Sequence, residues 1–388
     1  MKIEPLDKSG LPEIVSLSND SIAQITTDSG FVYRIQVRAL PHLMGCVYLI
    51  KLDPDCWALI DSGCGDDDCN ADIEYGLNIV RSDFEPEFRF DKIRYIFLTH
   101  AHIDHFGGAF EWKKRTNAEV WIHAFESRVV EQYDDCAHVE NRRYVAWLLE
   151  SGVSQENVER VLKGFGFRPG RAKNLPVDRK FYGGETFHSL RFFYLPGHSS
   201  GHTAFLFGNV IFSGDLLLSK TLTQVWPTRM TPQTGLLNYV YSLKNLERIA
   251  LNFKLRRGKG ILALPAHEDP IYDIPARVEI ALRGMERRNQ RILKILRETE
   301  KPLCLEELTR RMYLTGNSDR TFFALSDVGC RVEFLLQLGL LKFANPERLS
   351  SEEPVLRYQK LLANTESTKN TIEQVVRMYL ACYDSDAI

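Results

Sequence analysis

The stretch THAHIDH (residues 99–105) decides how this sequence is interpreted. It places three histidines and one aspartate within six residues, at the end of an apolar run that begins at Ile93 and is predicted to be a buried strand. Polar groups at the end of a buried strand must either reach solvent or bind a partner. Because imidazole and carboxylate groups are the usual ligands of zinc and similar metals, the stretch predicts a metal site.

Three later segments repeat the same arrangement. His198 follows the run FFYLPG, Asp215 follows VIFSG, and His267 follows ILALPA. Each of these potential metal ligands therefore lies where a predicted strand ends and a turn begins. Ligands from distant segments commonly converge on loops at one edge of a rigid sheet. We expect these residues to join the first stretch in a single site.

Composition narrows the class of protein. The chain has 388 residues, with 49 Lys and Arg against 51 Asp and Glu, for a formal net charge of −2. This balance argues against a general nucleic-acid coat or a polybasic membrane binder. The 8 cysteines form no C-x-x-C pair, and the first ten residues lack the apolar core of a signal peptide. We expect a cytoplasmic protein with reduced thiols and no membrane contact.

The order of predicted elements indicates two parts. Residues 1–30 show little pattern, whereas strand-like runs and helical segments alternate from residue 31 to about 270, which predicts a mixed α/β core with two sheets. After Pro275 the sequence predicts three helices and a small hairpin, the outline of a winged helix. A further terminal helix at 371–383 is a candidate contact in a homodimer. The ranges of the three helices are 276–298, 303–313 and 321–341.

These motifs resemble those of the metallo-β-lactamase superfamily. H-x-H-x-D-H, a later P-G-H, a G-D and a final P-x-H occur in the order that the superfamily uses, and DSGCG at 61–65 matches its early D-x-G loop. The resemblance implies an αββα sandwich of two mixed sheets at 1–275, with a helical cap inserted at about 125–180. It further implies a winged-helix-like α-helical domain at 276–388. The tail resembles the branch that contains glyoxalase II-like hydrolases and β-lactamase-like endoribonucleases.

The resemblance also implies a role for each motif residue. Two divalent metal ions are expected, with zinc preferred and iron or manganese as alternatives. Asp215 would bridge both ions, and Asp61 would hold a ligand or its loop in place. The first metal would be held by His100, His102 and His198, and the second by Asp104, His105 and His267.

Hydrolysis follows from such ligands. Two dications about 3.5–4 Å apart can bridge one water, lower its pKa and so provide a hydroxide that attacks an ester or thioester carbonyl. Asp104 is a candidate catalytic residue because it can orient that water or receive its proton. His202 is a second candidate, either in contact with substrate or packed within its loop. The intact ligand set argues against a non-catalytic binding protein.

Two local basic features suggest the substrate. The loop 163–180 is rich in Lys and Arg, which indicates either a solvated loop or a cationic lip for a small anionic substrate. Its candidate substrate-binding residues are Arg168, Arg171 and Lys173.

The second feature is the predicted helix that begins near residue 276, which carries a basic face. This face is either solvated or able to contact phosphates, so the alternative function is a phosphodiesterase or endoribonuclease acting on single-stranded RNA. Its basic residues are Arg283, Arg287, Arg291 and Lys294.

One departure from the family pattern stands out. Glu268 and Asp269 follow the last ligand, where the family usually has Gly-His-Gly. Two acids beside a ligand could tune the metal or restrict access to it.

Overall fold

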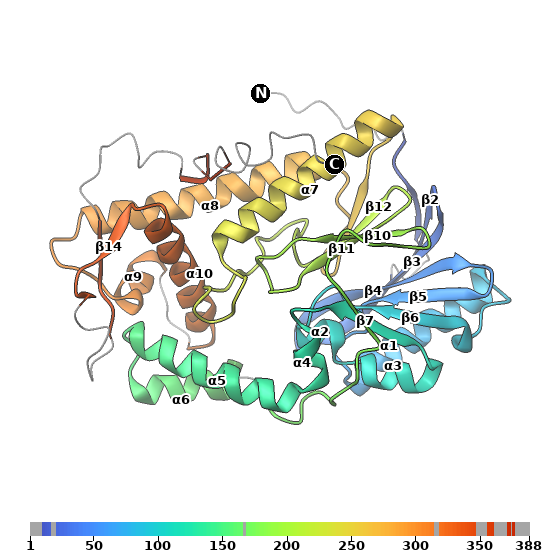
Figure 1. Ribbon diagram of the computed structural model, residues 1–388, viewed down its shortest axis with the longest axis horizontal. Helices are drawn as coiled ribbons and strands as arrows, with labels where there is room; N and C mark the ends of the chain where they lie inside the picture. Colours follow the sequence, from blue (N-terminus) through green and yellow to red (C-terminus); the bar gives the residue numbers. More distant parts are fainter. Residues whose placement is uncertain are drawn as a thin grey trace.

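The computed structural model consists of two packed β-sheets with helices on both outer faces, followed by a helical region with a small hairpin (Figure 1). This arrangement confirms the predicted αββα class. Most of the predicted terminal helix lies outside the described residues. The structure describes residues 10–16, 21–165, 168–313, 318–346, 355–360, 371–373 and 375–376.

The first sheet has eight strands in sequential order. Strands β1 to β5 pair antiparallel, and β5 to β8 pair parallel, so the sheet is mixed. Its strands are β1 (Glu13–Ser16), β2 (Ile22–Thr27), β3 (Gly30–Leu40), β4 (Leu43–Asp53), β5 (Cys56–Ile60), β6 (Ile93–Phe97), β7 (Glu119–His123) and β8 (Arg179–Phe181).

The first two strands differ from the sequence expectation, which saw little pattern before residue 31. Residues Ile22 and Ile25 are fully buried, and β2 pairs with β3 along its whole length. The signal was weak because Ile22 and Ile25, the two large apolar residues of this strand, are three positions apart and so do not alternate. Pairing with the long β3, rather than a strong local pattern, makes this segment a strand.

The second sheet has five strands in the order β13-β12-β11-β10-β9. Only the β12–β13 pair is parallel. Aromatic side chains fill the space between the two sheets, among them Phe97 from the first sheet and Phe192 and Phe205 from the second, which contact one another. The strands are β9 (Thr186–Phe187), β10 (Leu190–Tyr194), β11 (Thr203–Phe207), β12 (Val210–Gly214) and β13 (Leu262–Pro265).

Helices cover the outer face of each sheet. Ile73, Leu77 and Trp112 pack on the first sheet from two of these helices. Leu243 and Leu246, from the helix on the other side, pack on the second. The helices of the first face are α1 (Asp67–Ile79), α2 (Ile103–Phe106) and α3 (Ala109–Thr116), and the second face carries α7 (Leu236–Arg257).

The remaining helices lie in two segments, which we call the cap, from α4 to α6, and the tail, from α8 to β15. In Figure 1 the cap helices α5 and α6 lie below α9 and α10, to the left of the sheets. Helix α10 ends earlier than predicted, because Gly339 turns the chain with φ +67°. The elements are α4 (Ser127–Glu131), α5 (Tyr133–Glu150), α6 (Gln155–Phe165), α8 (Ile274–Arg297), α9 (Leu305–Met312), α10 (Ser318–Gln337), β14 (Leu341–Phe343) and β15 (Tyr358–Lys360).

The tail shares its hydrophobic core with the second sheet. One continuous cluster includes Leu206 of β11, Leu243 of α7, Val278 of α8 and Val328 of α10. The cap joins the same cluster through Trp147. A Cβ atom added to Gly329 of α10 would lie 2.7 Å from the Trp147 ring and 3.3 Å from Pro227. Glycine at this position therefore allows the tail, the cap and the loop that contains Pro227 to pack closely.

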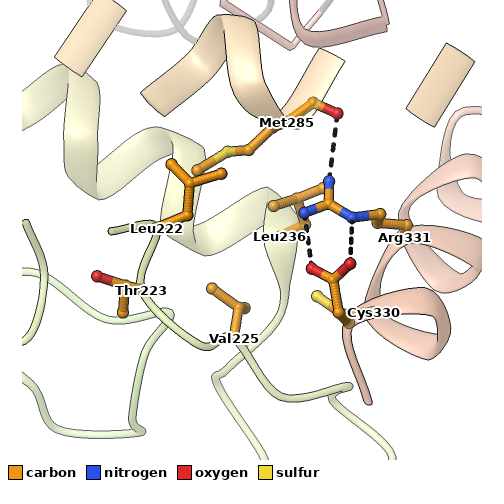
Figure 2. Close-up of a pocket in the computed structure, with 8 residues that line it drawn as sticks. Leu222, Thr223, Val225, Leu236, Met285, Cys330 and Arg331 are labelled. Carbon is orange, nitrogen blue, oxygen red and sulfur yellow. Dashed lines mark hydrogen bonds and ion pairs between the residues drawn. The ribbon is translucent and has the colours of Figure 1, made fainter. Parts of the chain in front are cut away.

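A buried ion pair lies within the tail. The guanidinium of Arg331 donates to both carboxylate oxygens of Asp327, to the carbonyl of Met285 and to Oδ1 of Asn289. Tyr313 donates to the same carboxylate over 2.6 Å. Arg331 borders a small pocket of about 270 Å³ empty volume, shown in Figure 2. The pocket is lined by Leu222, Thr223, Val225, Leu236, Met285, Asp327, Cys330 and Arg331.

Within the described part of the chain, no helix is both long and apolar enough to cross a membrane.

Candidate metal centre

Three histidine nitrogens converge at the ends of β6 and β10. His198 Nε2 lies 3.2 Å from His100 Nε2 and 3.0 Å from His102 Nδ1, and the last two atoms are 3.0 Å apart. Nitrogens that bind one tetrahedral zinc at about 2.0–2.1 Å would stand roughly 3.3 Å apart. The three positions therefore fit the ligands of a single ion.

A second group of donors lies next to the first. The Nε2 atom of His267 is 3.4 Å from Asp104 and 3.5 Å from Asp215. His105 Nε2 is 3.7 Å from Asp104 and 3.6 Å from Asp215. Asp215 is also 3.5 Å from His198 Nε2, so it stands between the two groups. The structure thus brings together every residue that the sequence proposed as a ligand.

The outer hydrogen bonds of three histidines direct a lone pair into the site. His198 Nδ1 lies 2.8 Å from the Gln224 carbonyl, and His267 Nδ1 lies 2.7 Å from the Met44 carbonyl. A carbonyl can only accept, so each Nδ1 carries the proton and each Nε2 presents a lone pair when the ring is neutral. His105 is arranged in the same way by a carboxylate.

That carboxylate belongs to Asp61, which follows β5. Its Oδ2 atom lies 2.9 Å from His105 Nδ1, while its Oδ1 atom accepts from the backbone N–H of Thr99 over 2.8 Å. Asp61 is 3% exposed and adopts a φ of +62°, a conformation that costs free energy in a non-glycine residue. The residue thus links the first ligand loop to the orientation of one ligand.

Two buried polar atoms show that the site is incomplete without a cation. His105 Nε2 and Asp215 Oδ1 are buried and have no hydrogen-bond partner among the described residues. Native proteins rarely leave such atoms unsatisfied without a functional reason. Converging lone pairs and carboxylates satisfy each other only through a positive ion, so the donor set fits the expected metals.

The pKa values of the two groups differ. Burial lowers the pKa of His198 to about 4, and burial also holds the pKa of His100 well below its usual range. Burial acts to lower the pKa of His267 too, but the Asp215 and Asp104 carboxylates outweigh it and raise the value to about 9. The Asp104, Asp215 and Asp61 carboxylates likewise outweigh burial at His105 and hold its pKa well above the ordinary value. The first group is therefore neutral at pH 7, whereas in the second group both carboxylates are ionised and both histidines are protonated in place of a metal.

His202 supports the site from within. Its side chain is fully buried, and its Nε2 accepts the backbone N–H of Asp215 over 3.1 Å. A substrate would need an exposed edge of this ring, and the ring has none. Of the two alternatives for His202, packing within the loop fits the geometry, with the added role of orienting Asp215.

Sequence reasoning missed Glu126, a buried acid just after β7. Its carboxylate accepts the backbone N–H of Ala101, between two ligands, and that of Gly201 over 2.7 Å. It therefore holds together the two loops that supply the first group of histidines. The only local sign of this role was an acidic residue close to the end of a predicted strand. The partners of Glu126 are distant in sequence, so the sequence did not reveal them.

The predicted cationic lip is only partly available. Arg171 forms a two-bonded ion pair with Asp66, and Arg168 donates to the carbonyl of Lys163 over 2.9 Å. The Lys173 ammonium lies 4.6 Å from the centre of the Phe110 ring. Arg168 and Lys173 remain exposed, while Arg171 mainly fastens the loop to the start of α1.

Comparisons with known proteins identify the fold and the family. Residues 41–267 match the family described as the metallo-β-lactamase superfamily. A metallo-β-lactamase family protein from Thermus thermophilus superposes with a TM-score of 0.63 at 23% identity, over 85% of this chain and 98% of that chain. A β-lactamase domain protein from Burkholderia ambifaria gives a TM-score of 0.66 at 18% identity, over 85% of this chain and 92% of that chain.

These two structures share the fold, and the family match spans more than half of the chain, from just before β4 to the last histidine of the site. The protein therefore belongs to the metallo-β-lactamase superfamily, a family of metal-dependent hydrolases.

Proposed function

We propose that this protein is a dinuclear metal hydrolase that cleaves the ester or thioester bond of a small anionic substrate. One observation carries the proposal: the donor atoms of seven buried or nearly buried side chains face one another in two adjoining groups that share Asp215. A site for a single ion would need fewer donors than these two groups provide.

Each group has its own donor chemistry. Three imidazoles would hold the first ion, and two imidazoles with Asp104 would hold the second, with Asp215 between them. Nitrogen and oxygen donors of this kind suit zinc, and iron or manganese are alternatives. Bound there, two divalent ions would supply a water of lowered pKa and a Lewis acid for the scissile carbonyl.

The chain's own residues would bind and orient the reactants. The Asp104 and Asp215 side chains are 11% and 13% exposed, more than the side chains of His105, His198 and His267. Together with His102, which is also partly exposed, these carboxylates lie on the accessible side of the site, where a substrate would enter. Burial acts to raise the pKa of Asp104, but His105 and His267 outweigh it and lower the value to about 2. At neutral pH this carboxylate is therefore ionised and could bind a cation or orient an attacking water.

A small anionic substrate is favoured over double-stranded nucleic acid by how the tail packs. Helix α10 would be the recognition helix of a winged-helix domain, and most of its described positions are buried. Its Glu333 accepts the backbone N–H of Thr228 over 2.7 Å, so this helix faces the catalytic part of the chain. A helix in this position cannot enter a groove of nucleic acid.

The alternative, cleavage of single-stranded RNA, draws support from the exposed basic face of α8. Arg287 and Arg291 lie on this face, while Arg283 pairs with Glu279 and Lys294 lies 3.8 Å from Glu298. This face could contact a phosphate backbone. The two functions make different demands on α8, so they can be separated.

The test combines metal analysis with a substrate panel. The purified full chain should contain about two metal ions, and it should hydrolyse thioesters or lactones in preference to phosphodiesters or single-stranded RNA. His102→Ala combined with Asp104→Ala should reduce hydrolysis to background while the circular dichroism spectrum is unchanged. His138→Ala, at an exposed histidine of α5, is the matched control and should be fully active.

Two outcomes would overturn the proposal. Folded protein that binds no metal would remove the basis of the mechanism. Cleavage of RNA that is lost on Arg287→Glu with Arg291→Glu, without cleavage of any thioester or ester, would establish the alternative.

A further inference from the structure

Glu268 directly follows the ligand His267 and has an unusual backbone. Its φ is +68°, a left-handed conformation that glycine adopts easily and glutamate does not. Residues held in such conformations persist only where the surrounding structure enforces them, and they often serve a function. Glutamate at this position therefore needs a reason.

The reason lies in the contacts of its carboxylate. The two oxygens accept the backbone N–H groups of Lys220 and Thr221, the Thr221 hydroxyl over 2.7 Å and the Ser219 hydroxyl over 3.2 Å. The Glu268 carbonyl also accepts from Arg34 over 2.9 Å. One side chain thus accepts from two backbone N–H groups and both hydroxyls of the three-residue turn 219–221.

That turn lies in the segment 216–224, which has a metal-site residue at each end. The segment begins after the shared carboxylate of Asp215 and ends at Gln224, whose carbonyl fixes the His198 ring. A second residue, Arg277 of α8, holds the same turn through the opposite charge, since it donates to the carbonyls of Leu218 and Thr221. The turn is therefore held by an anion on its N–H groups and a cation on its carbonyls.

We propose that Glu268 is a positioning residue that fixes the segment 216–224 and thereby sets Asp215 and His198 relative to His267. The proposal rests on the metal centre proposed above. It explains why an acid occupies a position whose backbone suits glycine: glycine would relieve the conformation but leave the turn without its acceptor.

The deciding experiment uses Glu268→Gly in the full chain and measures hydrogen exchange of the 216–224 backbone in metal-free protein. Glycine accepts the observed φ, so any loss comes from the missing carboxylate. We expect exchange at Lys220 and Thr221 to accelerate at least tenfold. Zinc-loaded variant should also lose metal to a chelator about 10- to 100-fold faster than wild type, the range typical when a residue that supports a ligand is removed.

Two further variants define the result. Asp269→Asn is the matched control, because the carboxylate of this neighbour pairs with the exposed Lys220 ammonium over 2.7 Å, and it should change neither measurement. Glu268→Gln keeps one acceptor oxygen and should fall between Glu268→Gly and wild type.

Unchanged exchange in both Glu268 variants would overturn the inference. Wild-type protein that binds no metal would instead refute the proposed function, and the exchange measurement would still decide the role of Glu268.

Discussion

The metal centre and the Asp327–Arg331 pair are both buried groups of ionisable side chains, and they are satisfied in opposite ways. In the tail, all three guanidinium nitrogens of Arg331 donate to acceptors within the protein. In the metal centre, His105 Nε2 and Asp215 Oδ1 have no such partner among the described residues. Both clusters are therefore buried and charged. They differ because, of these two clusters of described residues, only the metal centre contains nitrogen and oxygen atoms that lack a hydrogen-bond partner and could bind a metal.

The largest effect is expected at the shared carboxylate. Asp215→Ala removes the group that lies within 3.6 Å of three histidines, so both metal ions should be lost and hydrolysis should fall to background. Metal content and turnover check this result. The fold should survive, because the aromatic core between the two sheets is unchanged; retention of two ions would contradict the role given to Asp215.

The tail cluster should respond in stability and not in metal content. Asp327→Asn leaves the Arg331 guanidinium buried, with 5% of its side chain exposed and its ionic partner gone. Breaking a buried ion pair from one side costs about 3–5 kcal/mol. Denaturant unfolding of metal-loaded protein should show this loss while two ions remain bound. Loss of metal without loss of stability would reverse the comparison.

A smaller effect is expected where the metal centre depends on a hydrogen bond. In Asp61→Asn, the amide would donate to His105 Nδ1 and so place the ring proton on Nε2, the atom that must bind metal. Metal affinity should fall about 10- to 100-fold. Competition with a chromophoric chelator measures it, and Asp91→Asn, at an exposed acid, serves as the control. Equal affinities would show that Asp61 only shapes its loop.

The smallest expected effect is the change in the stability contribution of Asp327 at low pH. Burial acts to raise the pKa of Asp327, but Arg331 and Arg288 outweigh it and lower the pKa below its ordinary value. This carboxylate therefore contributes stability above about pH 3.9, its unfolded value, and loses that contribution as the pH falls through its folded pKa. The stability difference between wild type and Asp327→Asn should shrink below about pH 4. A difference that is constant with pH would exclude this ion pair as its source.

Sequence alone could predict the ligands because two independent features, a short motif and the end of an apolar strand, coincide at each of them. His100 and His267 each belong to a short motif, and each stands where an apolar strand ends. The structure brings these strand ends together from both sheets, because His100 follows β6 of the first sheet and His267 follows β13 of the second. Local patterns thus mark the ligands, and the packing of the two sheets makes them converge. The two-sheet class follows from the same alternation of strands and helices.

The supporting residues could not be predicted in this way. Glu126 and Arg277 act through contacts with segments that lie far away in the sequence, and each looks like an ordinary charged residue in its own segment. Glu268 stood out only as an acid beside a ligand, and its contact with Thr221 was not visible in the sequence. Arg171 shows the converse, since a basic loop suggested substrate binding and the structure pairs this residue with Asp66. Pairing across the fold is a property of packing, which one sequence does not display.

Gly329 lies in α10, outside the metal centre, but substitutions at this position should still affect the metal centre. Any side chain there would collide with Trp147 and press on Pro227, and the segment of Pro227 continues directly from the residue that orients His198. A random screen for inactive alleles should therefore recover substitutions at Gly329, in a helix that supplies none of the residues of the metal centre. The absence of a side chain at position 329 should therefore be as necessary for activity as the histidines of the site.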